Sequence, residues 1–245
     1  MSPLLSQLLS IDPNIVLHIP GDAACTRSDI GPAFTQANIT NSFDNGACGG
    51  VQPIRATFNG TSSLATSPTI ASEPTIFPTT LTWLARYRTT STTNQILRFT
   101  STRTGGSVLN GYDFGVNPST GILEIAVLAG GAVAGTTLVN FNRTATGIAS
   151  GAWHTVGFSV TVSSNTVARI WYDGAQLGAT GSMTGLMGYG NTTARKLIGN
   201  FDSGATARYL PGDLAYVTKW GAELTADQMT AAHLTMSIGP SRRAA

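Results

Sequence analysis

The sequence predicts an all-β protein, an antiparallel sandwich of two sheets with one short helix near its C-terminal end. Three observations predict this class. Apolar and polar residues alternate with a period of two in many short segments. The gaps between these segments are rich in Gly, Pro, Asn and Ser. Only one segment, late in the chain, has both the spacing and the capping residues of a helix. Many short strands separated by turn residues favour a sandwich.

The composition fits one sizeable β domain with a neutral, hydroxyl-rich surface. Of the 245 residues, 42% are hydrophobic and only 11% are charged, against roughly 25% charged in an average soluble domain. The net charge is +2. The nearest thing to a basic patch is Arg86, Arg88, Arg98 and Arg103. Nucleic-acid-binding proteins cluster more cations than this, and no apolar run approaches the ~20 residues of a membrane span. We therefore expect no nucleic-acid partner and no membrane insertion.

The first residues have a pattern of their own. Leu4, Leu5, Leu8 and Leu9 fit one face of a short helix. They predict an N-terminal arm over residues 1–13 that docks on neighbouring molecules, and a frayed terminus is the alternative. The segment has no basic region and no long apolar run, so it is a poor signal peptide.

The best strand signals lie between Trp153 and Gly174. "WHTVGFSVTV" places His154, Val156, Phe158, Val160 and Val162 on one face. "VARIWYD" places Ala168, Ile170 and Tyr172 opposite Val167, Arg169 and Trp171. Ser163, Ser164 and Asn165 predict a hairpin between these two strands. Asp173-Gly174 predicts a further two-residue turn, because both residue types tolerate positive φ.

The remaining elements follow from the same signals. "LTWLARY" places Leu81, Trp83, Ala85 and Tyr87 on one face. Further strands are predicted at Ile15–Ile19, Ile54–Phe58, Ile96–Thr100, Tyr112–Val116, Ile122–Leu128, Thr137–Phe141, Lys196–Gly199 and Asp213–Trp220. A helix is predicted from Ala226 to about Leu234, because Thr225 and Gln228 form a capping box. Leu224, Met229 and Leu234 are expected to face the sheet. Residues 14–235 are predicted to form the domain, and residues 236–245 a tail.

Several of these segments together resemble a known superfamily. In order they are "VLHIPGDA", "IRATFNGTSSLAT", "LTWLARYR", "WHTVGFSV", "ARIWYDGAQLG", "KLIGN" and "LPGDLAYVTKWGAELTADQMTAAHL". This set resembles the laminin G-like / concanavalin A-like jelly-roll superfamily (LamG-like module), and the match spans roughly Asn14 to Leu234. The resemblance implies one convex and one concave antiparallel sheet. It also implies that Phe158 and Tyr172 fill the space between the sheets, that Trp153 caps an edge, and that Gly199 allows the close approach of a neighbouring backbone.

The sequence gives little sign of catalysis. Glycosidases on this fold carry an E-x-D-x-(x)-E strand, because retaining hydrolysis needs two carboxylates roughly 5–5.5 Å apart. The chain has three glutamates, Glu73, Glu124 and Glu223, and none of them completes such a motif. Glu124 is interpreted as a surface-facing residue or a solitary buried polar group, and Glu223 as a residue beside the helix start. We predict no catalytic residues, and hence a protein that is not an enzyme.

Binding residues are predicted mainly in loops. LamG-like modules often hold Ca²⁺ at the rim, so Ca²⁺ is the one cofactor that stays open, with Asp22 and Asp29 as its candidate ligands. Aromatic side chains in or near loops are candidate carbohydrate ligands, and these are Tyr112, Tyr189, Phe201 and Tyr209. His154 is interpreted as structural. Whether Cys25 and Cys48 form a disulfide depends on the compartment and stays open.

Two functions follow from these features. The first is a non-enzymatic structural or attachment protein of a virion, such as a capsid decoration or a tail or fibre accessory of a tailed bacteriophage. Its partners would be capsid or tail proteins, further copies of the chain, or surface glycans. The neutral surface, the arms at both ends and the lack of a catalytic set favour it. The alternative is a secreted or cell-surface carbohydrate-binding, lectin-like module, which would place the protein outside the cell.

Overall fold

The computed structural model describes residues 3–20, 30–31, 34–43, 54–68, 80–103, 111–128, 137–162, 165–184, 195–200 and 209–238. Its helices are α1 (Pro3–Ile11) and α2 (Ala226–Ile238). Its strands are β1 (Ile15–Pro20), β2 (Thr35–Ala37), β3 (Ile39–Phe43), β4 (Ile54–Asn59), β5 (Leu64–Thr66), β6 (Thr80–Arg88), β7 (Leu97–Arg103), β8 (Gly111–Asn117), β9 (Ile122–Leu128), β10 (Thr137–Thr144), β11 (His154–Val162), β12 (Asn165–Tyr172), β13 (Ala175–Gln176), β14 (Gly181–Thr184), β15 (Arg195–Ile198) and β16 (Pro211–Trp220).

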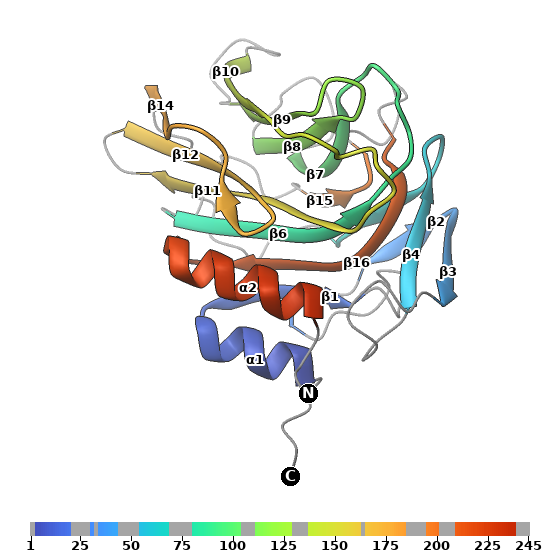
Figure 1. Cartoon of the computed structure of the whole chain (residues 1–245), viewed down its shortest axis with the longest axis horizontal. Coiled ribbons are helices and arrows are strands. Elements are labelled where there is room, and N and C mark those ends of the chain that lie inside the picture. The colour runs from blue at the N-terminus through green and yellow to red at the C-terminus, as the bar shows by residue number, and fades with distance from the viewer. Residues whose placement is uncertain are drawn as a thin grey trace.

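These strands form two antiparallel sheets stacked face to face (Figure 1). The larger has nine described strands, with the order β13-β12-β11-β6-β16-β4-β3, while β1 pairs with β16 and β14 pairs with β12. The smaller has seven, in the order β10-β9-β8-β7-β15-β5-β2. The predicted fold class, an all-β two-sheet sandwich with a C-terminal helix, is therefore confirmed.

The core between the sheets is built by the faces that alternation predicts. Trp83 of β6 and Phe158 of β11 are opposite one another in the strand register and have stacked rings. Phe114 of the seven-stranded sheet meets Trp83 edge to face, with ring centroids 5.5 Å apart. The predicted inward residues Ala85, Tyr87, Val156, Val160, Ala168 and Ile170 are all buried in the same cluster. Burial of such side chains stabilises the fold by about 1.5–3 kcal/mol each.

A second core lies on the other face of the nine-stranded sheet, under the two helices (Figure 1). Leu84 and Trp171, which alternate with the inward-facing residues of β6 and β12, pack here with α2. Leu4, Leu5 and Leu8 of α1 belong to the same cluster. The prediction of a helical face is confirmed, but its interpretation as a docking arm or a frayed terminus is wrong, because these leucines are buried within the chain.

The structure confirms two predictions that rest on local sequence patterns, the Asp-Gly turn and the start of α2. Asp173 and Gly174 both have positive φ, 48° and 82°, and join β12 to β13 as predicted. The Thr225 amide donates to the Gln228 side chain, and the Gln228 amide donates to the Thr225 hydroxyl, which confirms the capping box. Leu234, however, is 47% exposed. The face that meets the sheet is Met229, Ala232 and Met236, and a residue five positions after Met229 has rotated away from it.

Two further expectations can be compared with the structure. Gly199 has a φ of 93°, and an added Cβ would clash with the Phe58 ring and stand 3.1 Å from the backbone oxygen of Ser63, so both a ring and a neighbouring backbone approach it closely. Three of the four arginines singled out in the sequence have polar partners among the described residues. Arg88 pairs with Asp213, Arg98 with Glu124, and Arg86 donates to Ser237 of α2. Neither α1 nor α2 has the length and apolar character needed to cross a membrane.

Candidate functional site: a polar pocket beside helix α2

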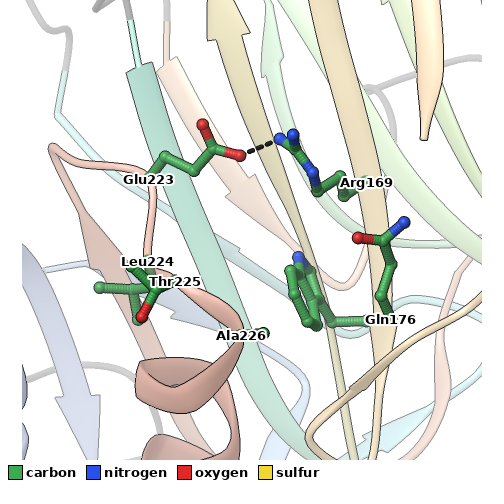
Figure 2. A pocket seen from close by; sticks show the side chains of 7 residues that line it. Arg169, Gln176, Glu223, Leu224, Thr225 and Ala226 are labelled. Carbon is green, nitrogen blue, oxygen red and sulfur yellow. Dashed lines mark hydrogen bonds and ion pairs between the residues drawn. The ribbon is translucent and has the colours of Figure 1, made fainter.

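An open pocket lies where the edge of the nine-stranded sheet meets the start of α2 (Figure 2). Its volume is about 350 Å³, and it is lined by Arg169, Trp171, Gln176, Glu223, Leu224, Thr225 and Ala226. This volume falls within the range of small-molecule sites in proteins. We call this hollow the α2 pocket.

An ion pair forms one wall of the α2 pocket. The strand period puts Arg169 on the same face of β12 as Trp171, which is the face turned toward α2. The Arg169 guanidinium donates to the Glu223 carboxylate, and both side chains keep about a quarter of their surface open, 27% and 28%. The other carboxylate oxygen of Glu223 accepts from the Thr161 hydroxyl. The pair is therefore anchored on the protein side and accessible on the pocket side.

The side chain of Gln176 lies beside Arg169, because its strand β13 pairs with β12 (Figure 2). Its Nε2 donates to the carbonyl oxygen of Gly178 at 2.9 Å and to the Thr180 hydroxyl at 3.3 Å. These two acceptors fix the amide with its oxygen directed toward the pocket, as Figure 2 shows. Gln176 therefore presents a held hydrogen-bond acceptor to anything that enters.

The floor and the remaining edge come from Trp171 and from the first residues of α2. Trp171 is almost completely buried, and its indole N–H donates to Ser159 at 3.1 Å. Thr225, the residue that caps α2, is exposed at the rim. The α2 pocket therefore offers one cationic donor group, a carboxylate, an amide oxygen and a hydroxyl around an indole floor. Groups of this kind suit a ligand rich in hydroxyls.

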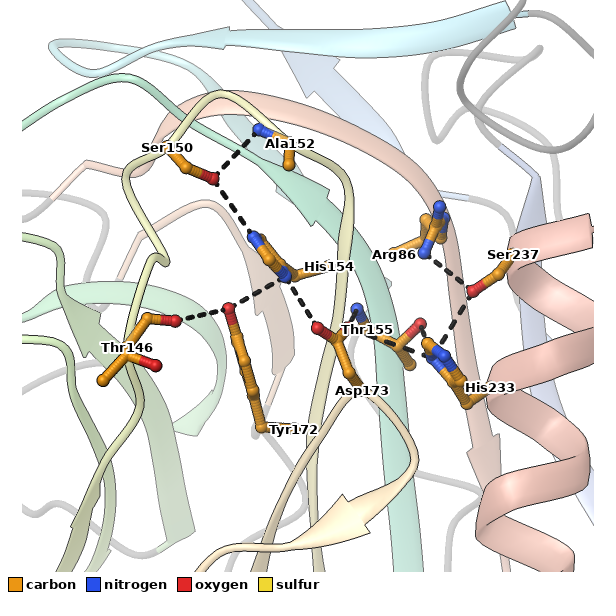
Figure 3. A network of polar contacts seen from close by, with 10 residues as sticks. All are labelled: Arg86, Thr146, Ser150, Ala152, His154, Thr155, Tyr172, Asp173, His233 and Ser237. Carbon is orange, nitrogen blue, oxygen red and sulfur yellow. Dashed lines mark hydrogen bonds and ion pairs between the residues drawn. The ribbon is translucent and has the colours of Figure 1, made fainter.

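A second polar cluster joins β11 and β12 to α2 (Figure 3). His154 Nδ1 lies 2.8 Å from both Asp173 Oδ2 and the Tyr172 hydroxyl, and Asp173 Oδ1 accepts from the Thr155 amide at 2.8 Å. Because the carboxylate can only accept, Nδ1 carries the hydrogen. His233 of α2 contacts the Thr155 hydroxyl at 3.0 Å. The cluster therefore holds the Asp-Gly turn and the helix against the sheet.

Burial and the neighbouring charges shift the pKa values of three residues in this cluster. Burial raises the pKa of Asp173, but the hydrogen bonds from His154 and the Thr155 amide outweigh it, so the net pKa lies below the ordinary value. Burial lowers the pKa of His233; Asp173 opposes this, while Arg86 and His154 add to it. Burial, with the Asp173 charge, raises the pKa of Tyr172.

Asp173, His154 and Ser150 contact one another in the order of a catalytic triad, but Ser150 lacks the environment of a catalytic nucleophile. Its hydroxyl lies 3.4 Å from His154 Nε2. That oxygen also accepts from the Ala152 amide. The neighbouring amides of Ser150 and Gly151 donate to the carbonyls of Gly147 and Thr89, so neither is available to stabilise an oxyanion. The contacts of Ser150 are those of a turn, and the structural interpretation of His154 agrees with its partners.

The outer face of the seven-stranded sheet carries buried charges that the sequence interpretation of Glu124 missed. Glu124 is neither surface-facing nor solitary, because its carboxylate accepts from Arg98 at 3.0 Å and only about 5% of the residue is exposed. Asp113 shares this face on the neighbouring strand and is 1% exposed. Both alternatives for Glu124 are therefore wrong.

The predicted ligand residues are not brought together by the described part of the chain. Tyr209 is partly buried just before β16. Tyr112 lies in β8 opposite Val127, with its side chain outside the described residues. Tyr189, Phe201, Asp22, Asp29, Cys25 and Cys48 also lie outside them. Among the residues that are described, no three His, Cys, Asp or Glu side chains are placed to hold a metal ion.

The α2 pocket was missed because its residues are distant in the sequence. Glu223 was correctly placed beside the helix start, but its partner Arg169 lies 54 positions earlier. The alternation places Arg169 on the same face as Trp171 and opposite Ile170, and this is the one sequence signal that points to the pocket. A charged residue two positions before a large aromatic residue, on the same face of a strand, indicates that the buried part of that face ends there.

Several solved structures have a fold similar to that of this chain. Domain 4 of AbnA, an extracellular arabinanase from Geobacillus stearothermophilus in complex with arabinotriose, is 14% identical with a TM-score of 0.58, and the alignment covers 90% of this chain and 98% of that one. The sialidase of Trypanosoma rangeli is 12% identical with a TM-score of 0.61, and the alignment covers 91% of this chain and 33% of the sialidase.

The binding domain of botulinum neurotoxin DC is a third similar structure. In its complex with SialylT it is 9% identical with a TM-score of 0.62, and the alignment covers 92% of this chain and 52% of that chain. The same domain is also known in complex with rat synaptotagmin II. This chain thus spans about half of the toxin domain and a third of the sialidase. No family model matches the sequence, and no curated protein does.

Proposed function

We propose that this chain is a glycan-binding module without catalytic activity, and that its ligand occupies the α2 pocket. The observation that carries the proposal is the pairing of Arg169 with Glu223 beside the fixed amide of Gln176, in an open hollow of about 350 Å³. Donors and acceptors held in place by the protein lose little conformational entropy when they bind hydroxyl groups.

Two of the similar structures support a sugar ligand. One is an arabinanase domain with arabinotriose, and the other is a toxin binding domain with SialylT. The arabinanase domain is aligned over nearly its whole length, so the comparison there concerns one complete domain. The toxin domain with synaptotagmin II supports a protein partner as a further role for the same fold.

Titration calorimetry with a panel of oligosaccharides tests the proposal. Arg169→Ala and Gln176→Ala should each weaken binding by at least tenfold, because each removes a group that contacts the ligand. Gln36→Ala is the matched control, since it removes an exposed amide from β2 in the other sheet. Binding that survives both pocket variants would exclude the α2 pocket as the site.

The absence of catalysis is tested separately. We expect no release of reducing ends from polysaccharides. Asp113 and Glu124 share a face of neighbouring strands, so they are a pair of described carboxylates to test for hydrolysis. Hydrolysis that disappears in Asp113→Asn would contradict the proposal and assign the outer face of the seven-stranded sheet as an active site.

The setting in which the module works is a separate proposal. In the first setting, predicted from the sequence, the module lies on a virion and binds glycans or capsid and tail proteins. In the alternative setting it is a secreted or cell-surface lectin. Co-purification with particles would favour the first setting. Recovery from the culture medium or from the cell surface, without particles, would favour the second.

A further inference from the structure

We infer that the α2 pocket selects neutral glycans over sialylated ones, and that Glu223 is the residue that sets this preference. The inference rests on the proposed function, because it assigns a ligand class to the same pocket.

The first step is the charge of the α2 pocket. Arg169 is the only cation among its lining residues, and Glu223 neutralises it through a direct hydrogen bond. Asp227 adds a second negative charge in the first turn of α2. This charge meets the partial positive charge of the helix N-terminus, which otherwise favours anions. A ligand carboxylate therefore finds no excess positive charge in the pocket.

The second step is the hydrogen-bonding capacity. The Glu223 carboxylate accepts only, and Gln176 has its amide hydrogens directed to Gly178 and Thr180, which leaves its oxygen for the pocket. A sugar hydroxyl can donate to one of these acceptors and accept from Arg169 at once. An ionised carboxylate has no hydrogen to donate, so it would meet acceptor oxygens on two sides.

The third step explains why Glu223 stays in place when a ligand enters. One of its oxygens accepts from Arg169 and the other from the Thr161 hydroxyl. A sialic acid carboxylate that accepts from the remaining N–H groups of Arg169 would lie beside the anchored Glu223 carboxylate and be repelled by it. A neutral sugar meets no such repulsion, and it can also donate to the lone pairs that the two anchoring bonds leave unused.

The test compares lactose and sialyllactose, which differ only in the terminal sialic acid, by titration calorimetry at low salt. We expect lactose to bind at least tenfold more tightly. Sialyllactose that binds equally well or better would overturn the inference and leave the proposed function standing. If no glycan of the panel binds, sialyllactose included, the proposed function itself fails, so the two failures are distinguishable.

Glu223→Gln provides the residue-level test. The substitution keeps the shape and one acceptor but removes the charge, so the affinity ratio should shift toward sialyllactose on the order of tenfold. Gln36→Ala is the control, because this exposed amide lies in β2 of the other sheet, and its ratio should stay within about twofold of the original. An unchanged ratio in folded Glu223→Gln would contradict the role of Glu223. Were this variant not to fold, the preference of the unaltered protein would decide.

Discussion

The guanidinium of Arg98 in β7 donates a hydrogen bond of 3.0 Å to Glu124 in β9, across the full width of the intervening strand β8. The residue of β8 that lies opposite both of them is Gly115. An added Cβ there would stand 2.6 Å from the Leu97 carbonyl oxygen and 3.0 Å from Cδ of Arg98. The pair therefore depends on a glycine, and it ties three strands together on the outer face of the sheet.

Gly115→Ala should destabilise the protein by about 1–3 kcal/mol, because the methyl group must push apart a backbone carbonyl and the Arg98 side chain. Chemical denaturation gives the free energy of unfolding. Gly221→Ala is the control, since its Cβ would meet the end of the Val16 side chain at 3.3 Å and the Asn14 carbonyl oxygen at an ordinary 3.8 Å. Equal stability of the two variants would show that β8 has room for a side chain.

Glu124→Gln should lower the free energy of unfolding by about 3–5 kcal/mol, because it removes the charged partner of a buried guanidinium. The double variant Arg98→Met/Glu124→Leu should recover a large part of this loss. Glycan binding at the α2 pocket should be unchanged in the double variant. A single variant as stable as the original would mean that the pair contributes nothing to the fold.

Leu8→Ala should cost about 2–5 kcal/mol, because Leu8 is completely buried between α1, α2 and the nine-stranded sheet. Gln7→Ala, one position earlier and only partly buried, should cost less than about 1 kcal/mol. Thermal unfolding measures both. If Leu8→Ala left stability intact but changed the oligomeric state, the helix would be a docking arm after all.

Stability should fall as the pH drops below 6.5, and His233 should account for part of this fall. The pKa of His233 is lowered in the folded state, so the unfolded chain takes up its proton first. Its contribution is therefore full above pH 6.5 and is lost as the pH falls from 6.5 toward the lowered value. Asp173 acts in the same direction below 3.8. Denaturation of His233→Gln should give a flatter profile near pH 6, and an unaltered slope would refute this.

The sequence carried enough information for the fold because its strongest signals are local. Alternation along single strands predicted the inward faces of β6, β11 and β12, and the Asp-Gly pair predicted the turn after Tyr172. The capping box predicted the start of α2 for the same reason, since Thr225 and Gln228 are three positions apart. Each of these patterns is set by the geometry of one element.

The candidate site could not be predicted in this way because its contacts depend on how elements pack. Arg169 meets Glu223 only because β12 and the segment before α2 lie side by side, and Arg98 meets Glu124 only through the register of three strands. The leucines of α1 show the same limit. Their spacing predicts an apolar helical face, but nothing in it says which surface will cover that face.

The most direct test of the α2 pocket is an NMR titration of the isotope-labelled protein with arabinotriose, a neutral oligosaccharide. We predict that the side-chain signals of Arg169 and Gln176 and the amide signal of Thr225 shift in a saturable way, while signals of β7, β8 and β9 stay in place. Shifts confined to those three strands, or saturable binding that moves none of the pocket signals, would contradict the account.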